Sequence, residues 1–388
     1  MDPYDFAAER LPTDTRNAIA AFWDQFTAQA DGLDRCFSTN MTDMTVDPTE
    51  VMSALQDVSP DLMWEFGASD RGHALTITAE WNDEIRPLAR AIHHMAPDLP
   101  RWQFHEARPP GAEVDHIADY VAQRFGAPLI LTRLDASVGK DGRIDLAAFG
   151  PGDKKTLFDQ ALSLATSLFG EATERDWVGF VDSKPAGKPG LFSRLRGQPQ
   201  TEFSAADFAD NFRAAIAKAK SGLPAKPYAA TPLDDRGSAL FRVNITDPNH
   251  PRADLFTFVG PSTTYGNAVL SGGRFSSLCH STHGEWFLFL RIPRTDDMPF
   301  DRVEERSAIE EHLHAALSRD RLGGTVGAGH GHQAVYIDLA VTDVAQGVAR
   351  ISEALKSAPY AAMSTLHFLD QGLRGLVLPA APDTEKPN

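Results

Sequence analysis

Hydrophobic residues recur along this chain with a strand period and a helix period, and the clearest alternation of the two lies near the C-terminus. Residues 334–341 (AVYIDLAV) are β-branched or apolar apart from one aspartate, which predicts a strand that is buried on at least one face. In residues 344–355 the apolar positions are spaced by four, three and four, which places them on one helical face. Asp343 is positioned to cap this helix and Pro359 ends it, before a predicted strand over residues 363–369.

The same order of strand, helix and strand recurs twice nearer the N-terminus. Each of these units begins with a predicted hairpin and continues with a helix and a third strand, over residues 62–67, 74–81, 84–95 and 102–107 in the first unit and residues 129–134, 143–149, 154–169 and 177–181 in the second. The tetrapeptide Ile-Asp-Leu-Ala occurs at 144–147 and again at 337–340. The sequence therefore predicts an α+β fold of two or more ferredoxin-like β/α units, in mostly antiparallel sheets with helices on one face.

Two stretches without a hydrophobic period indicate how the chain is divided. Residues 183–203 are rich in proline, glycine and basic side chains, and residues 222–237 form a second loose stretch after a predicted helix. We therefore expect four parts: an acidic N-terminal α+β domain over 1–183, a linker and helix over 184–237, a C-terminal α+β domain over 238–378 and a disordered tail over 379–388.

Charge is distributed unevenly along the 388 residues, whose net charge is −16. Residues 1–183 hold 15 Lys or Arg against 31 Asp or Glu, whereas residues 184–388 hold 22 of each. An acidic half of this kind argues against a nucleic-acid backbone as the partner, so no nucleic-acid binding is expected. It would suit a basic protein partner through electrostatic steering, and a role in solubility alone is the plainer interpretation.

Several features bear on the compartment. No apolar run reaches the length of a transmembrane helix, and the first residues lack the basic and apolar regions of a signal peptide. The two cysteines, Cys36 and Cys279, form no spaced motif. We therefore expect a cytoplasmic protein without membrane association, whose oligomeric state the sequence leaves open.

Five glycines crowd into residues 323–331, directly before the strand at 334–341. A phosphate-binding loop places its glycines between a strand and the helix that follows, so that the helix N-terminus faces the anion. Here the predicted order is helix, glycines and strand, and no Gly-Lys-Ser/Thr follows. The pattern therefore favours a flexible or positive-φ connection over a nucleotide site.

A cysteine and four histidines in two predicted loops are the candidate ligands of a divalent metal. Cys279, His280 and His283 precede the most hydrophobic strand of the chain, and His330 and His332 lie in the glycine-rich loop. If the strands that follow the two loops are neighbours, the loops can converge at one edge of a sheet and supply imidazole and thiolate ligands. The spacing matches no known zinc pattern, so local hydrogen bonding of these side chains is the alternative interpretation.

No complete catalytic motif accompanies these residues, since neither a Gly-x-Ser-x-Gly elbow nor a His-Glu-x-x-His sequence occurs. A dyad of Cys279 with a histidine would need an activated thiol, and catalytic residues stay unassigned. The sequence predicts a non-catalytic binding or regulatory protein with a protein partner. The alternatives are a metal-binding protein or metal-dependent hydrolase that uses the loop histidines, and a purely structural protein.

Two segments resemble uncharacterised bacterial proteins of unknown function. Residues 64–110 contain two strands, a helix that ends in Ala-Pro and a Trp-x-Phe strand, and residues 324–358 contain the glycine-rich turn and a Tyr-Ile-Asp-Leu strand. The general layout is similar to small ferredoxin-like regulatory domains, such as that of the regulator of ribonuclease activity B. The resemblance implies an immunity-like or regulator-like role and carries no catalytic residue to this chain.

Overall fold

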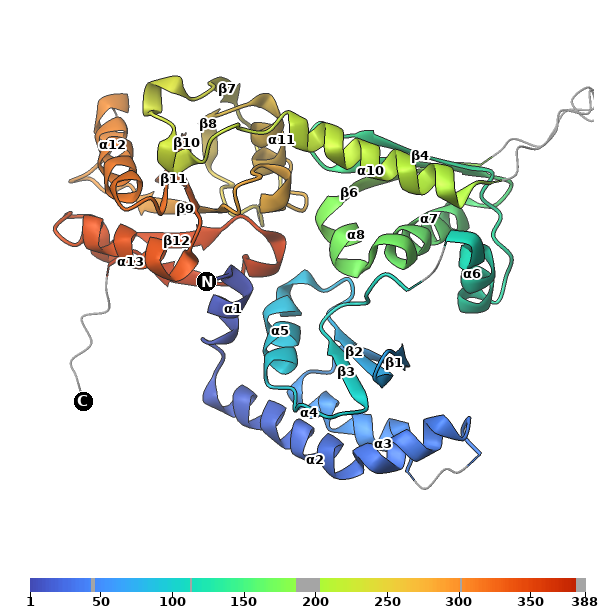
Figure 1. The fold of residues 1–388 in the computed structure, drawn as a ribbon. Coiled ribbons are helices and arrows are strands. Elements are labelled where there is room, and N and C mark those ends of the chain that lie inside the picture. Colours follow the sequence, from blue (N-terminus) through green and yellow to red (C-terminus); the bar gives the residue numbers. More distant parts are fainter. Residues whose placement is uncertain (43–45, 112–113, 186–202, 301, 382–388) are drawn as a thin grey trace, which may run out of the picture. The chain divides into compact units, whose positions relative to one another are not determined.

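The computed structural model describes residues 1–42, 46–111, 114–185, 203–300 and 302–381 (Figure 1). Helices make up 44% and strands 23% of it, which confirms the predicted α+β class. The chain divides into two compact units, Met1–Pro109 (unit 1) and Pro110–Asn388 (unit 2). The domain boundary predicted at residue 183 stays a prediction, because residues 186–202 lie outside the described part, as does the predicted tail from residue 382 on.

None of the described helices combines the length and the apolar character that crossing a bilayer requires.

Unit 1 is a three-stranded sheet covered by helices, and aromatic rings fill its core. Its elements are α1 (Pro3–Ala8), α2 (Thr13–Ser38), α3 (Pro48–Ser53), α4 (Leu55–Val58), β1 (Met63–Ser69), β2 (Gly72–Thr78), the 3₁₀ helix η1 (Asp83–Ile85), α5 (Arg86–His94) and β3 (Trp102–His105). The predicted hairpin β1–β2 is antiparallel, and α5 leads to β3, which pairs parallel with β2. The Phe26 ring of α2 packs edge-on against Trp102 and Phe104 of β3, with centroid distances of 5.0 and 5.6 Å.

Unit 2 begins with a second sheet of the same connectivity. Its elements are η2 (Val114–His116), α6 (Ile117–Phe125), β4 (Arg133–Val138), β5 (Ile144–Gly150), α7 (Lys154–Phe169), α8 (Glu171–Trp177), β6 (Val178–Pro185) and α10 (Ala205–Ser221). The hairpin β4–β5 is antiparallel, and β5 pairs parallel with β6 after the helices α7 and α8. Ser204 caps α10, because its hydroxyl accepts a hydrogen bond from the Asp207 N–H at 3.1 Å.

The rest of unit 2 is a seven-stranded antiparallel sheet in the order β13-β12-β9-β11-β10-β8-β7. Its elements are η3 (Tyr228–Ala230), η4 (Leu233–Asp235), β7 (Ala239–Arg242), β8 (Leu255–Gly260), α11 (Thr263–Leu270), η5 (Ser277–Cys279), β9 (Trp286–Pro293), α12 (Val303–Arg319), β10 (Gly323–Gly331), β11 (Ala334–Val341), α13 (Val344–Leu355), η6 (Ala361–Met363), β12 (Thr365–Phe368), η7 (Gln371–Leu373) and β13 (Val377–Pro379). From β9 to β12 the elements follow the order β-α-β-β-α-β that defines ferredoxin-like units. Assignment of this segment to that fold stays a prediction.

Both faces of the seven-stranded sheet are covered, which explains why β11 is almost continuously apolar. Every residue of β11 is buried, and its side chains alternate between the two faces. One face lies under α12 and α13, which pack against each other (Figure 1). On the other face Tyr336 and Ala340 join an aromatic core with Tyr265 of α11. The cap predicted for α13 is present, since the Asp343 carboxylate accepts from the Gln346 N–H at 2.9 Å.

The glycine-rich segment is a strand, so its interpretation as a flexible connection is wrong. All nine residues of β10 are buried, and β10 pairs with β8 on one side and β11 on the other. A Cβ atom at Gly327 would lie 2.5 Å from the Val259 carbonyl oxygen, and one at Gly329 would lie 2.9 Å from that of Thr257. The glycines therefore allow β8 to approach β10 more closely than any side chain permits.

An ion pair is buried in the aromatic face of this sheet. The Arg252 guanidinium lies 2.7 Å from the Asp338 carboxylate of β11, and the two side chains are 1% and 0% exposed. The guanidinium also lies over the Phe289 ring, 4.1 Å from its centroid. The Tyr265 hydroxyl donates to the second carboxylate oxygen at 2.9 Å. The Asp338 carboxylate, which is paired with Arg252, thus connects the middle of the sheet to helix α11 through the Tyr265 hydroxyl.

We expect Asp338→Asn to destabilise the protein strongly, because it leaves the Arg252 charge buried without a counter-charge. The free energy of unfolding, measured by urea titration, should fall by about 3–5 kcal/mol. The ion pair of the exposed Asp320 with the partly buried Arg350 provides the control, and Asp320→Asn should cost less than about 1 kcal/mol. Equal effects of the two variants would contradict a structural role for the buried pair.

Candidate ligand-binding site

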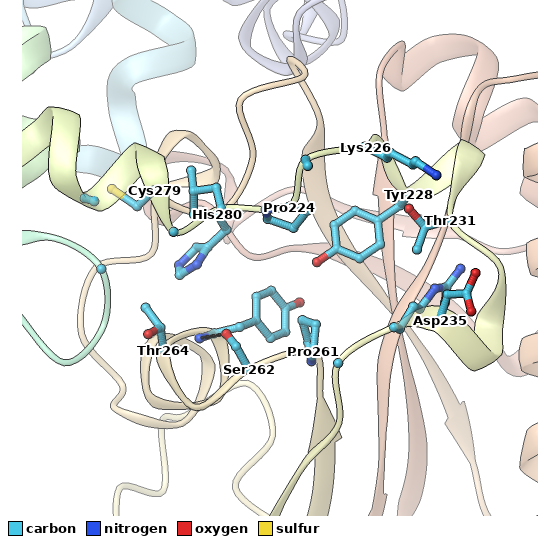
Figure 2. Close-up of a pocket in the computed structure, with 18 of the residues that line it drawn as sticks. Pro224, Lys226, Tyr228, Thr231, Asp235, Pro261, Ser262, Thr264, Cys279 and His280 are labelled. Carbon is cyan, nitrogen blue, oxygen red and sulfur yellow. Dashed lines mark hydrogen bonds between the residues drawn. The ribbon is translucent and has the colours of Figure 1, made fainter.

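Unit 2 contains a cavity of about 620 Å³ between the loop over residues 222–237, the 3₁₀ helix η5 and the first turn of α11. This volume lies within the range of small-molecule sites, about 300–1,000 Å³. Much of the wall is apolar, with Val138, Leu223 and Pro261 among its residues. In Figure 2 the Tyr228 hydroxyl and the His280 ring point toward the middle of the cavity. The arrangement of apolar walls with a few polar groups is typical of a ligand pocket.

One wall of the cavity is held by the segment that follows η5. The buried Glu285 carboxylate accepts from the Tyr228 backbone N–H at 2.6 Å and from the Ser281 hydroxyl at 2.7 Å. His283 Nε2 donates to the Pro224 carbonyl oxygen at 3.1 Å. Burial raises the pKa of the Glu285 carboxyl. Two hydrogen-bonded side chains therefore fix the loop whose residues Pro224 and Tyr228 line the cavity.

A second wall is formed by the first turn of α11. Ser262 caps this helix by accepting from the Tyr265 N–H at 3.1 Å. The Tyr265 ring is 1% exposed, and its hydroxyl is bound to Asp338 as described above. Burial and the Asp338 charge raise the pKa of Tyr265 well above its usual value, so the hydroxyl stays protonated and donates. The wall is consequently anchored in the core of the sheet.

The turn between β4 and β5 closes the cavity on a third side. Gly142 has a φ of +87°, and a Cβ atom there would lie 3.0 Å from Thr264 Cγ2 and 3.2 Å from the Cys279 carbonyl oxygen. The side-chain amide of Asn267 in α11 donates to the Lys140 carbonyl oxygen at 3.1 Å. Glycine at position 142 therefore permits both the turn conformation and the close approach of this turn to the cavity.

The two titratable groups at η5 are uncharged at neutral pH. Burial lowers the pKa of His280 to about 3, and the ring stacks on Phe275 at a centroid distance of 4.6 Å. Burial also raises the pKa of the Cys279 thiol to about 12. A thiol that stays protonated is a poor nucleophile, so Cys279 does not form the activated dyad considered from the sequence.

The charged residues of the cavity are mostly cationic. The lining includes three cationic side chains and one carboxylate, those of Lys218, Lys226, Arg236 and Asp235. The two lysines and the aspartate are exposed, whereas Arg236 is partly buried. In a chain whose net charge is −16, this lining is an unusual local excess of positive charge.

The five predicted metal ligands do not form one site. The strands that follow the two segments, β9 and β11, are neighbours, but they pair antiparallel, with Pro293 opposite Ala334. The beginning of β9 and the β10–β11 hairpin therefore lie at opposite ends of the strands. The predicted ligands divide accordingly into Cys279, His280 and His283 at one end and His330 and His332 at the other.

Each predicted ligand has a different environment. His283 is hydrogen-bonded to Pro224, and the His332 ring lies 4.9 Å from the Phe256 ring. Burial lowers the pKa of His330, which belongs to strand β10 and not to a loop. Within the described residues no group of three or more His, Cys, Asp or Glu side chains is arranged to hold a metal ion.

Sequence reasoning missed most of the cavity. It placed Cys279 and His280 at a candidate site, and both line the cavity, but it described residues 222–237 only as a loose stretch. Tyr228 and Arg236 in that proline-rich loop were the available signal, because aromatic and cationic residues on loops often bind ligands. Their approach to η5 depends on tertiary contacts that no local pattern shows.

No family model matches the chain, and no curated protein or solved structure matches it either. The resemblances noted from the sequence stay predictions, and the function is inferred from the geometry of the cavity.

The lowered pKa of His280 predicts how stability depends on pH. The folded protein keeps this ring neutral down to about pH 3, whereas the unfolded chain binds a proton near pH 6.5. The free energy of unfolding is therefore at its full value above pH 6.5. It decreases as the pH falls, because only the unfolded chain binds the proton. Between pH 6.5 and pH 5 the free energy of unfolding of the wild type, measured by urea titration, should fall by about 2 kcal/mol more than that of His280→Phe. Parallel pH dependences of the two proteins would contradict the buried neutral ring.

Proposed function

We propose that the chain is a non-catalytic binding protein of regulatory type, which holds a small organic molecule in the cavity of unit 2. The single observation that carries this proposal is the cavity of about 620 Å³, with its apolar wall and a few polar groups directed into it. Its walls are fixed by hydrogen bonds of the Glu285 and Tyr265 side chains, so little ordering is needed when a ligand binds.

The chemistry of the lining supports binding over catalysis. Cys279 is a protonated thiol, and His280 is a neutral ring whose neighbours Phe275 and Tyr265 are aromatic. A general base of the usual kind needs a pKa near the working pH, and His280 with a pKa of about 3 does not meet that requirement. The division of the loop histidines between two ends of the sheet likewise gives the metal-dependent alternative no support.

The uncharged dye N-phenyl-1-naphthylamine, which fluoresces in apolar surroundings, tests the proposal. We expect saturable binding with a Kd of ~0.1 mM or tighter, from about 0.3 kcal/mol per non-hydrogen atom. Ala219→Trp, at a partly buried position that lines the cavity, should abolish the binding by filling the space. Ala214→Trp, at an exposed position of the same helix α10, should preserve it.

Failure of the dye to bind would overturn the proposal. So would equal binding by the two tryptophan variants, because the dye would then occupy another place.

Unit 1 favours a second candidate function, the binding of a basic protein. Residues 1–109 contain 8 Arg, no Lys and 19 Asp or Glu, a net charge of −11. Asp24 and Asp31 are two of its exposed acids. Both lie in α2, one before and one after the middle of the helix. Such a surface attracts a basic protein through long-range electrostatics, which raises the association rate at low salt.

Proteins captured from a lysate by the wild-type chain test this candidate. A basic partner should be retained, with an association rate that falls steeply as the salt concentration rises. Asp24→Lys/Asp31→Lys should weaken its retention. Glu304→Lys/Glu311→Lys, the same change with the same spacing at exposed positions of α12, should have little effect. Retention that is insensitive to salt or equal for both double variants would exclude the acidic surface of unit 1.

A further inference from the structure

Arg236 is a cation that forms no direct ion pair with any described residue. Its Nη1 donates to the Thr325 hydroxyl at 2.6 Å, and its Nη2 donates to Nδ1 of the His314 ring. The Nε atom is buried and has no hydrogen-bond partner in the described part of the chain. No carboxylate among the described residues lies within ion-pair distance of this guanidinium. The Nε donor of this cavity-lining residue is therefore unsatisfied, and no direct ion pair with a described residue compensates its charge.

The hydrogen-bond partners of Arg236 are neutral, and the carboxylates of Glu285 and Glu310 act on its charge only from beyond ion-pair distance. Burial and the Arg236 charge lower the pKa of His314 to about 4, so its ring accepts a hydrogen bond without carrying a charge at neutral pH. Burial lowers the pKa of Arg236 to about 10, so the guanidinium stays protonated. A partly buried cation whose counter-charges lie beyond ion-pair distance is incompletely compensated, and a bound anion would offset that cost.

Other features of the cavity also favour a negative ligand. The first turn of α11 lies at the cavity through Ser262 and Thr264, and the N-terminus of a helix carries partial positive charge. Lys218 and Lys226 are exposed at the lining, against the single carboxylate of Asp235. Two exposed lysines of this kind raise the local concentration of anions near the entrance.

The uncharged surface of the cavity indicates which kind of body the anionic group of the ligand is attached to. Leu223, Pro224 and Pro261 contribute apolar wall, and Tyr228 and Tyr265 contribute aromatic rings. A ligand that carries several phosphates needs many more donors than one guanidinium and a helix N-terminus. The lining therefore fits one acidic group attached to an apolar or aromatic body.

We infer that the cavity binds a monoanionic organic acid, whose carboxylate or sulfonate is held by the Arg236 guanidinium while its aromatic or aliphatic body lies against Tyr228 and the proline-rich wall. This inference rests on the proposed function, since it specifies the ligand of the same cavity. A guanidinium presents its donors in a planar arrangement that matches such groups.

A pair of dyes with the same naphthylamine body tests the inference. The anionic dye 8-anilinonaphthalene-1-sulfonate carries a sulfonate that N-phenyl-1-naphthylamine lacks. We expect the wild type to bind the anionic dye about tenfold to a hundredfold more tightly than the neutral one, the usual gain from a charged hydrogen bond. Ala219→Trp should abolish the binding of both dyes.

Variants of Arg236 identify the group that gives this preference. Arg236→Gln should reduce the affinity for the anionic dye to that for the neutral dye and leave the neutral dye unaffected, whereas Arg236→Lys should retain part of the preference. Arg242→Gln, at an exposed position of β7 that does not line the cavity, is the matched control and should change neither affinity. Circular dichroism and thermal unfolding of each variant establish that it is folded.

The outcomes separate this inference from the proposed function. If neither dye binds, both are overturned. If both dyes bind equally, or if Arg236→Gln retains the preference while folded, the ligand is not held as an anion by Arg236, and the proposed binding function stands alone.

Discussion

The buried ion pair between Arg252 and Asp338 is the constraint on which the arrangement of unit 2 depends. Two charges in an apolar core are tolerated only when their partners are held in place, because each loses its hydration. The sheet supplies Asp338 from β11, and the Tyr265 hydroxyl satisfies its second oxygen. Since Tyr265 also lines the cavity, the requirement to neutralise the core charge fixes the position of one cavity wall.

The opposite wall depends on a second buried carboxylate, that of Glu285. It accepts a backbone hydrogen bond from Tyr228 and so holds a proline-rich loop that has little regular structure of its own. His283 strengthens the same attachment through the Pro224 carbonyl. A loop held in this way is preorganised for binding, and the cationic Arg236 at its end has no carboxylate of the described residues within ion-pair distance. The loop that Glu285 and His283 hold in place therefore also carries the cation that is proposed to bind the ligand.

The sequence predicted the local elements well, because hydrophobic period, caps and prolines act over a few residues. The β1–β2 hairpin, helix α5 and the Asp343 cap of α13 follow from such patterns. It failed at β10, since glycines usually interrupt a strand, and here they are required by the close approach of β8. The sequence did not predict the cavity either. Residues 222–237, η5 and α11 come together there through sheet pairing over long sequence separations, which local patterns do not show.

A crystal structure of the chain with 6-bromo-2-naphthoate would show whether the cavity holds an organic acid at Arg236, since anomalous scattering locates the bromine and electron density locates the carboxylate. We predict one ligand in the unit 2 cavity, with its carboxylate at hydrogen-bond distance from Arg236 and its rings against Tyr228. A cavity that holds only water, while the compound lies elsewhere or does not bind at millimolar concentration, would contradict it.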